Sequence, residues 1–110
     1  MAKKTDIKSV TSGAEELIRE IASTAVSEEH WVTHYGANDI HPRHLVFWIC
    51  VESDAERDRL RSDAALLDRL KSTLGAANYP EEGRAGVHFG FESQETVDRE
   101  SGGNWWHHWK

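Results

Sequence analysis

The chain has 110 residues, a formal net charge of -6 and a single cysteine, and these features exclude several classes of protein. Its 19 acidic residues outnumber its 13 lysines and arginines, which argues against nonspecific binding to nucleic-acid phosphates or to an anionic membrane surface. Cys50 cannot form an internal disulfide, and no apolar run approaches the roughly 20 residues of a membrane span. We therefore expect one cytoplasmic domain that folds around its own core.

The N-terminal part of the chain predicts an arm followed by a helix. Residues 1–11 are polar and mixed in charge, which is typical of a flexible arm ahead of a single domain over residues 12–103. Ser12 and Glu15 have the spacing of a capping box, and apolar residues then recur every three or four positions. This pattern predicts an amphipathic helix over residues 13–29.

Two strands are expected next. Residues 31–35 are rich in β-forming side chains, and residues 44–51 are apolar throughout from Leu45. A continuous apolar run is typical of a central strand that is covered on both faces. Cys50 lies inside this run, so we interpret it as a small buried side chain and not as a reactive thiol.

The second half of the chain begins with a long charged helix. Ser53 and Glu56 have capping-box spacing, the pair Ser62-Asp63 could divide the helix in two, and Gly75 is a candidate C-cap. A third strand follows, because apolar residues alternate with others over residues 87–92. The segment after it either begins a short helix or prolongs the strand. The order α-β-β-α-β predicts a small α+β domain, with a mixed sheet of about three strands packed by two main helices.

Histidines are concentrated in one stretch of the chain, at His30, His34, His41 and His44. Imidazole suits zinc, copper and nickel, and spacings of four and three residues can bring such rings to one face. The stretch lacks the H-E-x-x-H order of a zinc protease, and the chain has no second cysteine. We therefore expect surface histidines and no cofactor. A zinc or other transition-metal site, in a small metal-dependent or histidine-based enzyme, is the alternative.

The C-terminus has an unusual composition, since residues 104–110 contain Trp105, Trp106 and Trp109 after a Gly-Gly pair. Tryptophan is the residue type most enriched in interface hot spots, and an exposed cluster of such rings marks a partner contact. The same rings can instead fold back and complete the core. We expect a tail that is docked on the domain, and both uses of its rings stay open.

Acidic residues precede this tail, and a charged rim for a partner site is expected from Glu92, Glu95 and Asp98. The chain contains neither a nucleophile elbow nor a phosphate-binding glycine loop. We interpret it as a small, acidic, non-enzymatic protein-interaction domain. It would bind a larger protein partner as an inhibitor, immunity-type or regulatory protein, without nucleic acid or membrane. A homodimer joined through the tail or a sheet edge is a third interpretation.

Overall fold

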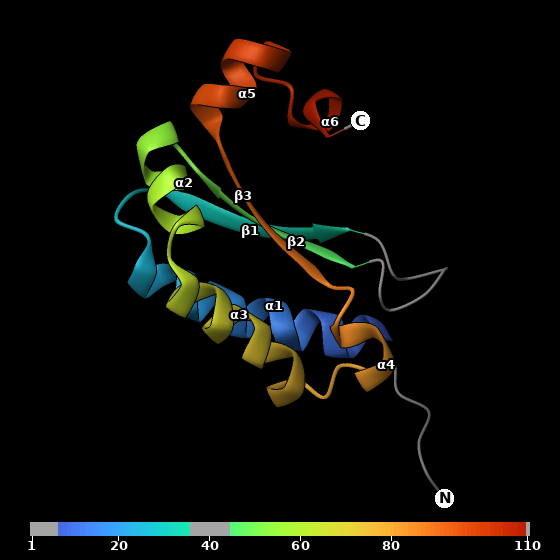
Figure 1. Ribbon diagram of the computed structural model, residues 1–110. Coiled ribbons are helices and arrows are strands. Elements are labelled where there is room, and N and C mark those ends of the chain that lie inside the picture. Colours follow the sequence, from blue (N-terminus) through green and yellow to red (C-terminus); the bar gives the residue numbers. More distant parts are fainter. Residues whose placement is uncertain (1–6, 36–44, 110) are drawn as a thin grey trace, which may run out of the picture.

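A three-stranded sheet divides the molecule into two layers in the computed structural model, which describes residues 7–35 and 45–109 (Figure 1). The strands lie in the order β1-β2-β3, where β1 (His30–Tyr35) is antiparallel to β2 (Val46–Val51). The third strand, β3 (His88–Ser93), is parallel to β2. The predicted α+β class, the small mixed sheet and the predicted order of elements are confirmed.

The first helix, α1, covers Ile7–Ala25, so it begins and ends earlier than the predicted 13–29. Its buried stripe starts with Thr11, Ala14 and Ile18. Ser12 therefore lies inside the helix and does not cap it. The helix extends toward the N-terminus because Val10 and Thr11 also pack against the core, a tertiary contact that the capping-box spacing does not reveal. The arm assigned to residues 1–11 overlaps this helix, and residues 1–6 lie outside the described residues.

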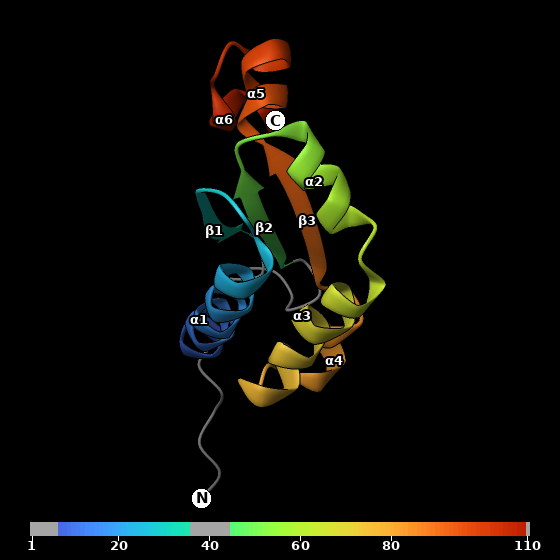
Figure 2. The same ribbon diagram turned by 90° about the vertical axis from the view of Figure 1, so that its left-hand side faces the viewer.

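Helices α2 (Asp54–Arg61), α3 (Ala64–Ala76) and α4 (Glu81–Arg84) connect β2 to its parallel neighbour β3 (Figure 2). A connection of this length is needed because parallel strands cannot be joined by a hairpin. Figure 2 shows α1 and α3 side by side below the sheet, where they form the helical layer.

Short polar side chains set the helix boundaries in this connection. The Ser53 hydroxyl accepts a hydrogen bond from the Glu56 N–H at 3.2 Å and caps α2. The predicted capping box is incomplete, because the Ser53 N–H donates to Glu28 Oε1 at 2.7 Å and not to Glu56. The break at Ser62-Asp63 is also present, because the Asp63 carboxylate caps α3 by accepting from the Leu66 N–H at 3.0 Å.

The end of α3 differs from the prediction. Gly75 does not end the helix, which runs on to Ala76. Asn78, two residues after the end of α3, adopts the left-handed conformation with φ of 61° and directs the chain away from the helix. Asparagine tolerates this conformation better than most residues, so it can take the place of glycine after a helix.

The core lies between the sheet and the helices α1 and α3. Alternate residues of the two parallel strands supply its sheet side, namely Phe47, Ile49, Val51, Phe89 and Phe91. Cys50 belongs to the opposite face of β2 and is fully buried. Burial, followed by the charge of Glu92, raises the pKa of its thiol to about 12, so the side chain stays protonated. Its interpretation as a small buried side chain is confirmed.

Glu56 ties α2 to the loop between α1 and β1. Its carboxylate accepts hydrogen bonds from the Ser27 N–H at 2.6 Å and the Ser27 hydroxyl at 2.8 Å. Arg59 donates to the same carboxylate at 2.6 Å and to the Ala25 carbonyl at 2.6 Å. The hydrogen bond from Arg59, and then those from Ser27, lower the pKa of Glu56 to about 2.

We expect Glu56 to make the domain acid-sensitive. Its folded pKa of about 2 lies below the ordinary 4.5, so its contribution is complete above pH 4.5 and is lost as the pH falls toward 2. A Glu56→Gln substitution should lower the free energy of unfolding at neutral pH by about 2 kcal/mol. Urea denaturation above, within and below this pH window measures the loss and the slope.

The exposed Glu81 provides the matched control for this measurement. Glu81→Gln should leave both the free energy of unfolding and its pH slope close to those of the unsubstituted chain, because surface substitutions have small effects. A Glu56→Gln variant that keeps the full acid slope would show that another group causes it.

Candidate partner-binding surface

The face of the sheet opposite α1 and α3 carries large aromatic side chains on β1 and β2. Val32 packs into the core, so by alternation Trp31, Thr33 and Tyr35 point to the opposite face of β1. Trp48 of β2 pairs with Thr33 and extends this surface across the sheet.

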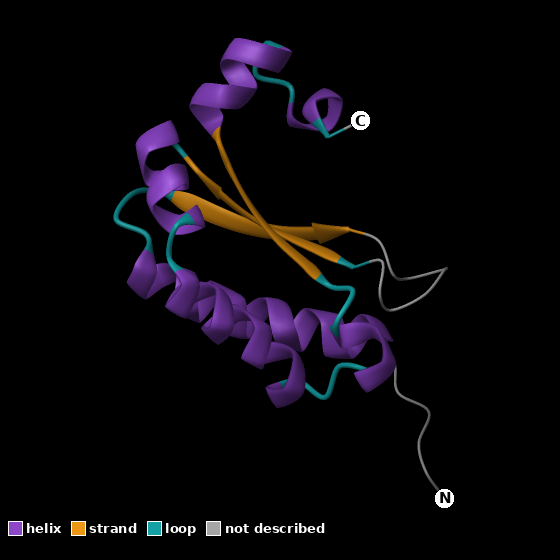
Figure 3. Ribbon diagram, viewed as in Figure 1, coloured by secondary structure: helices purple, strands orange, loops and turns teal. Residues whose placement is uncertain are grey.

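The C-terminal tail folds back over these side chains. Figure 3 shows helices α5 (Gln94–Ser101) and α6 (Trp105–His108) on the side of the sheet that α1 and α3 leave free. The ring centroids of Trp31 and Trp105 are 4.7 Å apart in an edge-to-face arrangement. Trp109 stacks on Trp48 with its centroid at 5.4 Å, and it lies 6.1 Å from Tyr35. We call this surface the aromatic face, and its residues are Trp31, Tyr35, Trp48, Trp105 and Trp109.

The aromatic face is only partly covered by the tail. Trp31 is 40% exposed and Tyr35 is 44% exposed, and they are the exposed large hydrophobic side chains among the described residues. Trp48, Trp105 and Trp109 are half-buried. Packing of the core does not require rings that are half exposed. The apolar surface of Trp31 and Tyr35 is therefore available for a further contact.

Two glycines let the tail reverse direction. Ser93 caps α5 by accepting from the Thr96 N–H at 3.2 Å, so the segment after β3 is a helix and not a longer strand. The helix ends at Gly102, and Gly102 and Gly103 both take the left-handed conformation, with φ of 59° and 82°. Glycine is the residue that adopts this conformation without steric cost, which allows α6 to turn back over the sheet.

A polar chain of contacts fixes the tail to the sheet. His108 contacts Glu92 Oε2 through Nε2 at 2.8 Å and the Ser101 hydroxyl through Nδ1 at 3.0 Å. The other oxygen of Glu92 accepts from Arg57 at 3.0 Å. The indole N–H of Trp105 donates to the Gln94 side-chain oxygen at 2.8 Å. The tail is therefore held by directional bonds as well as by ring contacts.

Glu92 is the centre of this chain of contacts. It is only 8% exposed, and burial alone would raise its pKa. Hydrogen bonds from His108, the Ser93 backbone and Arg57 outweigh that effect and lower the pKa of Glu92 below its ordinary value. Its carboxylate is thus ionised and satisfied inside the protein.

Asp54 joins α2 to α5 beside this site. Its carboxylate accepts from the hydroxyls of Ser93 and Thr96, the latter at 2.7 Å, and from Arg99 at 3.1 Å. These hydrogen bonds, above all the one from Ser93, hold the pKa of Asp54 well below its usual range. Such a network orients α5, and through α5 it positions the tail.

The structure places the predicted partner-binding residues in different environments. Trp105 and Trp109 lie on the aromatic face, and Trp106 belongs to the same short helix. Glu95 and Asp98 are exposed on α5, where Glu95 accepts from the Asp54 N–H at 2.6 Å and Asp98 from Gln94 at 2.8 Å. Glu92 is buried in the contacts described above.

Sequence reasoning missed Trp31 and Tyr35 as surface residues. Their spacing of four positions within a strand places both on one face, because side chains alternate with a period of two. That signal was available in residues 31–35, but it does not indicate which face the core covers.

The two described histidines of the predicted cluster lie apart. His30 and His34 share a face of β1, but four residues of strand separate them by about 13 Å. His30 Nδ1 contacts the Glu28 carbonyl at 3.0 Å, and His34 Nδ1 contacts Glu15 Oε1 at 2.8 Å. Within residues 7–35 and 45–109, no group of three or more histidine, cysteine or acidic side chains is arranged to hold a metal ion. His41 and His44 lie outside the described residues.

Similarity to known proteins does not indicate a function for this chain. No family model matches the chain, and neither a curated protein nor a solved structure shows significant similarity to it. Among the helices of the described ranges, none combines the length and the apolar character needed to cross a bilayer.

Proposed function

We propose that this chain is a non-enzymatic protein-interaction domain that binds a larger protein through the aromatic face. The observation that carries the proposal is the pair of half-exposed rings, Trp31 at 40% and Tyr35 at 44%, on the face where Trp105 and Trp109 dock. Rings of this kind supply much contact area and lose little conformational entropy when they bind.

The charge around the aromatic face favours a basic partner. Helix α5, which adjoins the tail, carries three exposed acidic residues, Glu95, Asp98 and Glu100. The whole chain has a formal charge of -6. An acidic rim around an apolar centre steers a positively charged surface into contact and suppresses binding of other acidic proteins. Such a domain would inhibit or regulate its partner by covering a basic site, and we place it in the cytoplasm.

Substitution of the two exposed rings should weaken partner binding while leaving the fold intact. The partner is isolated from lysate of the native host on the immobilised chain, then purified and titrated by calorimetry. We expect a Trp31→Ala/Tyr35→Ala variant to bind this purified partner about 1000-fold more weakly, because central aromatic residues contribute about 2 kcal/mol or more each when they form hot spots.

The control is Arg69→Ala, which removes an exposed side chain of α3 on the other layer of the molecule. It should bind the partner as tightly as the unsubstituted chain. If the Trp31→Ala/Tyr35→Ala variant is folded by circular dichroism and also binds with unchanged affinity, the aromatic face is not the interaction surface. Concentration-dependent self-association in place of any partner would instead assign the face to a homodimer.

A further inference from the structure

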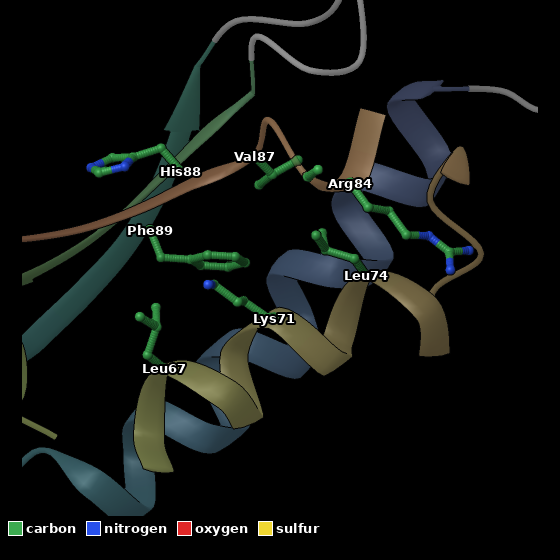
Figure 4. A pocket seen from close by; sticks show the side chains of 8 residues that line it. Leu67, Lys71, Leu74, Arg84, Val87, His88 and Phe89 are labelled. Atoms are coloured by element: carbon green, nitrogen blue, oxygen red, sulfur yellow. The ribbon is translucent and has the colours of Figure 1, made fainter. Parts of the chain in front are cut away.

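A groove along the outer edge of β3 forms a second surface, which borders the aromatic face at Trp48. One hollow of about 390 Å³ lies between α3, the end of α4 and the start of β3 (Figure 4). A second hollow of about 250 Å³ continues along the same strand toward α2. The two share Leu67, His88 and Phe89, so they lie next to each other along β3, and we call them together the groove.

The floor of the groove is apolar and its rim is cationic. Leu67, Leu74, Val87 and Phe89 supply the floor. Three cationic side chains, Arg61, Lys71 and Arg84, come from the surrounding helices. Figure 4 shows Lys71 extending from α3 toward Phe89 over the hollow.

The charge of this groove is opposite to that of the whole chain. Among residues 7–35 and 45–109, no acidic side chain lines either hollow. Within the described ranges, none of the ion pairs involves Arg61, Lys71 or Arg84. A local concentration of such cations, next to apolar surface, is complementary to a ligand that combines apolar groups with carboxylates.

The backbone of β3 adds hydrogen-bonding groups to the groove. The His88 N–H donates to the carbonyl of Leu45, the residue just before β2, at 3.0 Å. The backbone groups of His88 therefore point toward β2. In a strand, alternate residues direct their backbone groups to opposite sides, and Phe89 and Phe91 therefore direct theirs away from β2. Arg61 donates to the Phe91 carbonyl at 2.8 Å, which confirms the outward direction at that residue. The sheet order ends at β3, so the Phe89 backbone faces the groove.

We propose that this groove binds an extended acidic peptide segment, which adds to the β3 edge as a further strand. Its apolar side chains would contact Leu67 and Phe89, and its carboxylates would pair with Lys71. Strand addition supplies main-chain hydrogen bonds for affinity, and the hollows supply selectivity for alternate side chains. A small amphipathic carboxylate or a nucleic acid would satisfy the cations but would leave the strand edge unused. The second hollow is also lined by Trp48 of the aromatic face, but the contacts proposed here are to Leu67, Phe89 and Lys71.

A peptide selection tests the proposal directly. A phage library of random peptides of about ten residues, the length of an ordinary long strand, is selected on the immobilised full chain. Fluorescence anisotropy then gives the affinity of the synthetic consensus peptide. We expect a consensus in which acidic residues alternate with apolar ones, and binding about tenfold or more weaker for a Lys71→Glu variant. Amide chemical shifts of Leu67 and Phe89 should move when the peptide binds.

Charge reversal at a second site on the same helix provides the control. Arg69 is exposed on α3 but does not line the groove, so Arg69→Glu should leave the peptide affinity within about twofold. The proposal is overturned if no peptides are enriched, if the consensus lacks acidic residues, or if Lys71→Glu binds as tightly as the unsubstituted chain. It is also overturned if decanoate or an oligothymidylate binds the groove and the peptides do not.

Discussion

Replacing Gly90 by alanine should lower the free energy of unfolding by about 3 kcal/mol, the upper end of the range for overpacking. A Cβ atom at this position would lie 2.5 Å from Cζ3 of Trp48 and 2.7 Å from its Cε3. The Trp48 ring cannot easily move aside, because Trp109 stacks on it at 5.4 Å. The substitution should therefore displace the tail as well as the ring.

Urea denaturation followed by far-UV circular dichroism measures the effect of Gly90→Ala. The matched control is Gly75→Ala in α3, where an added Cβ would meet only Nη1 of Arg84 at an ordinary 3.6 Å. Because alanine is the better helix former, this control should gain about 0.5–1 kcal/mol. A Gly90→Ala variant as stable as the unsubstituted chain would show that Trp48 does not pack on β3.

Replacing Glu92 by alanine should cost about 3 kcal/mol, since removal of one partner of a buried charge pair leaves the other charges uncompensated. Glu92 contacts His108 at 2.8 Å and Arg57 at 3.0 Å, and its loss frees the tail from the sheet. Arg57 would still pair with the Asp58 carboxylate at 3.0 Å after the substitution. The loss of contacts should therefore affect mainly His108 and α6. We expect iodide quenching of tryptophan fluorescence to increase because the rings of Trp105 and Trp109 become accessible.

Glu100→Ala is the control for this second substitution. Glu100 is 58% exposed and lies 3.8 Å from Arg99, a surface pair whose removal should change stability by less than about 0.5 kcal/mol. If Glu92→Ala matches the control in both stability and quenching, the contact between His108 and Glu92 does not hold the tail in solution.

Local signals in the sequence predicted most of the fold. Ser53, Asp63 and Ser93 each cap a helix because a short polar side chain can reach the backbone two or three residues ahead. The alternation of Val87, Phe89 and Phe91 predicted a buried strand face, and all three side chains are buried. These features depend on neighbours in the chain, so a single sequence can indicate them, although it left open whether the segment after Ser93 is a helix or a longer strand.

Features that depend on distant contacts were harder to predict. The start of α1 depends on the burial of Thr11 against the rest of the domain. Glu92 looked like a surface acid because the sequence does not show that Arg57 and His108, from two other elements, meet its carboxylate. The histidine spacing of four residues would join His30 and His34 on a helix, but on a strand it separates them.

Hydrogen–deuterium exchange on the complex with the purified partner tests the proposed function most directly. The aromatic face predicts slower exchange over residues 30–35 of β1 and 105–108 of α6 when the partner is bound. Exchange over residues 7–25 of α1, on the opposite layer, should stay unchanged. Protection that is confined to α1 or α3, with β1 and α6 unaffected, would contradict the proposal.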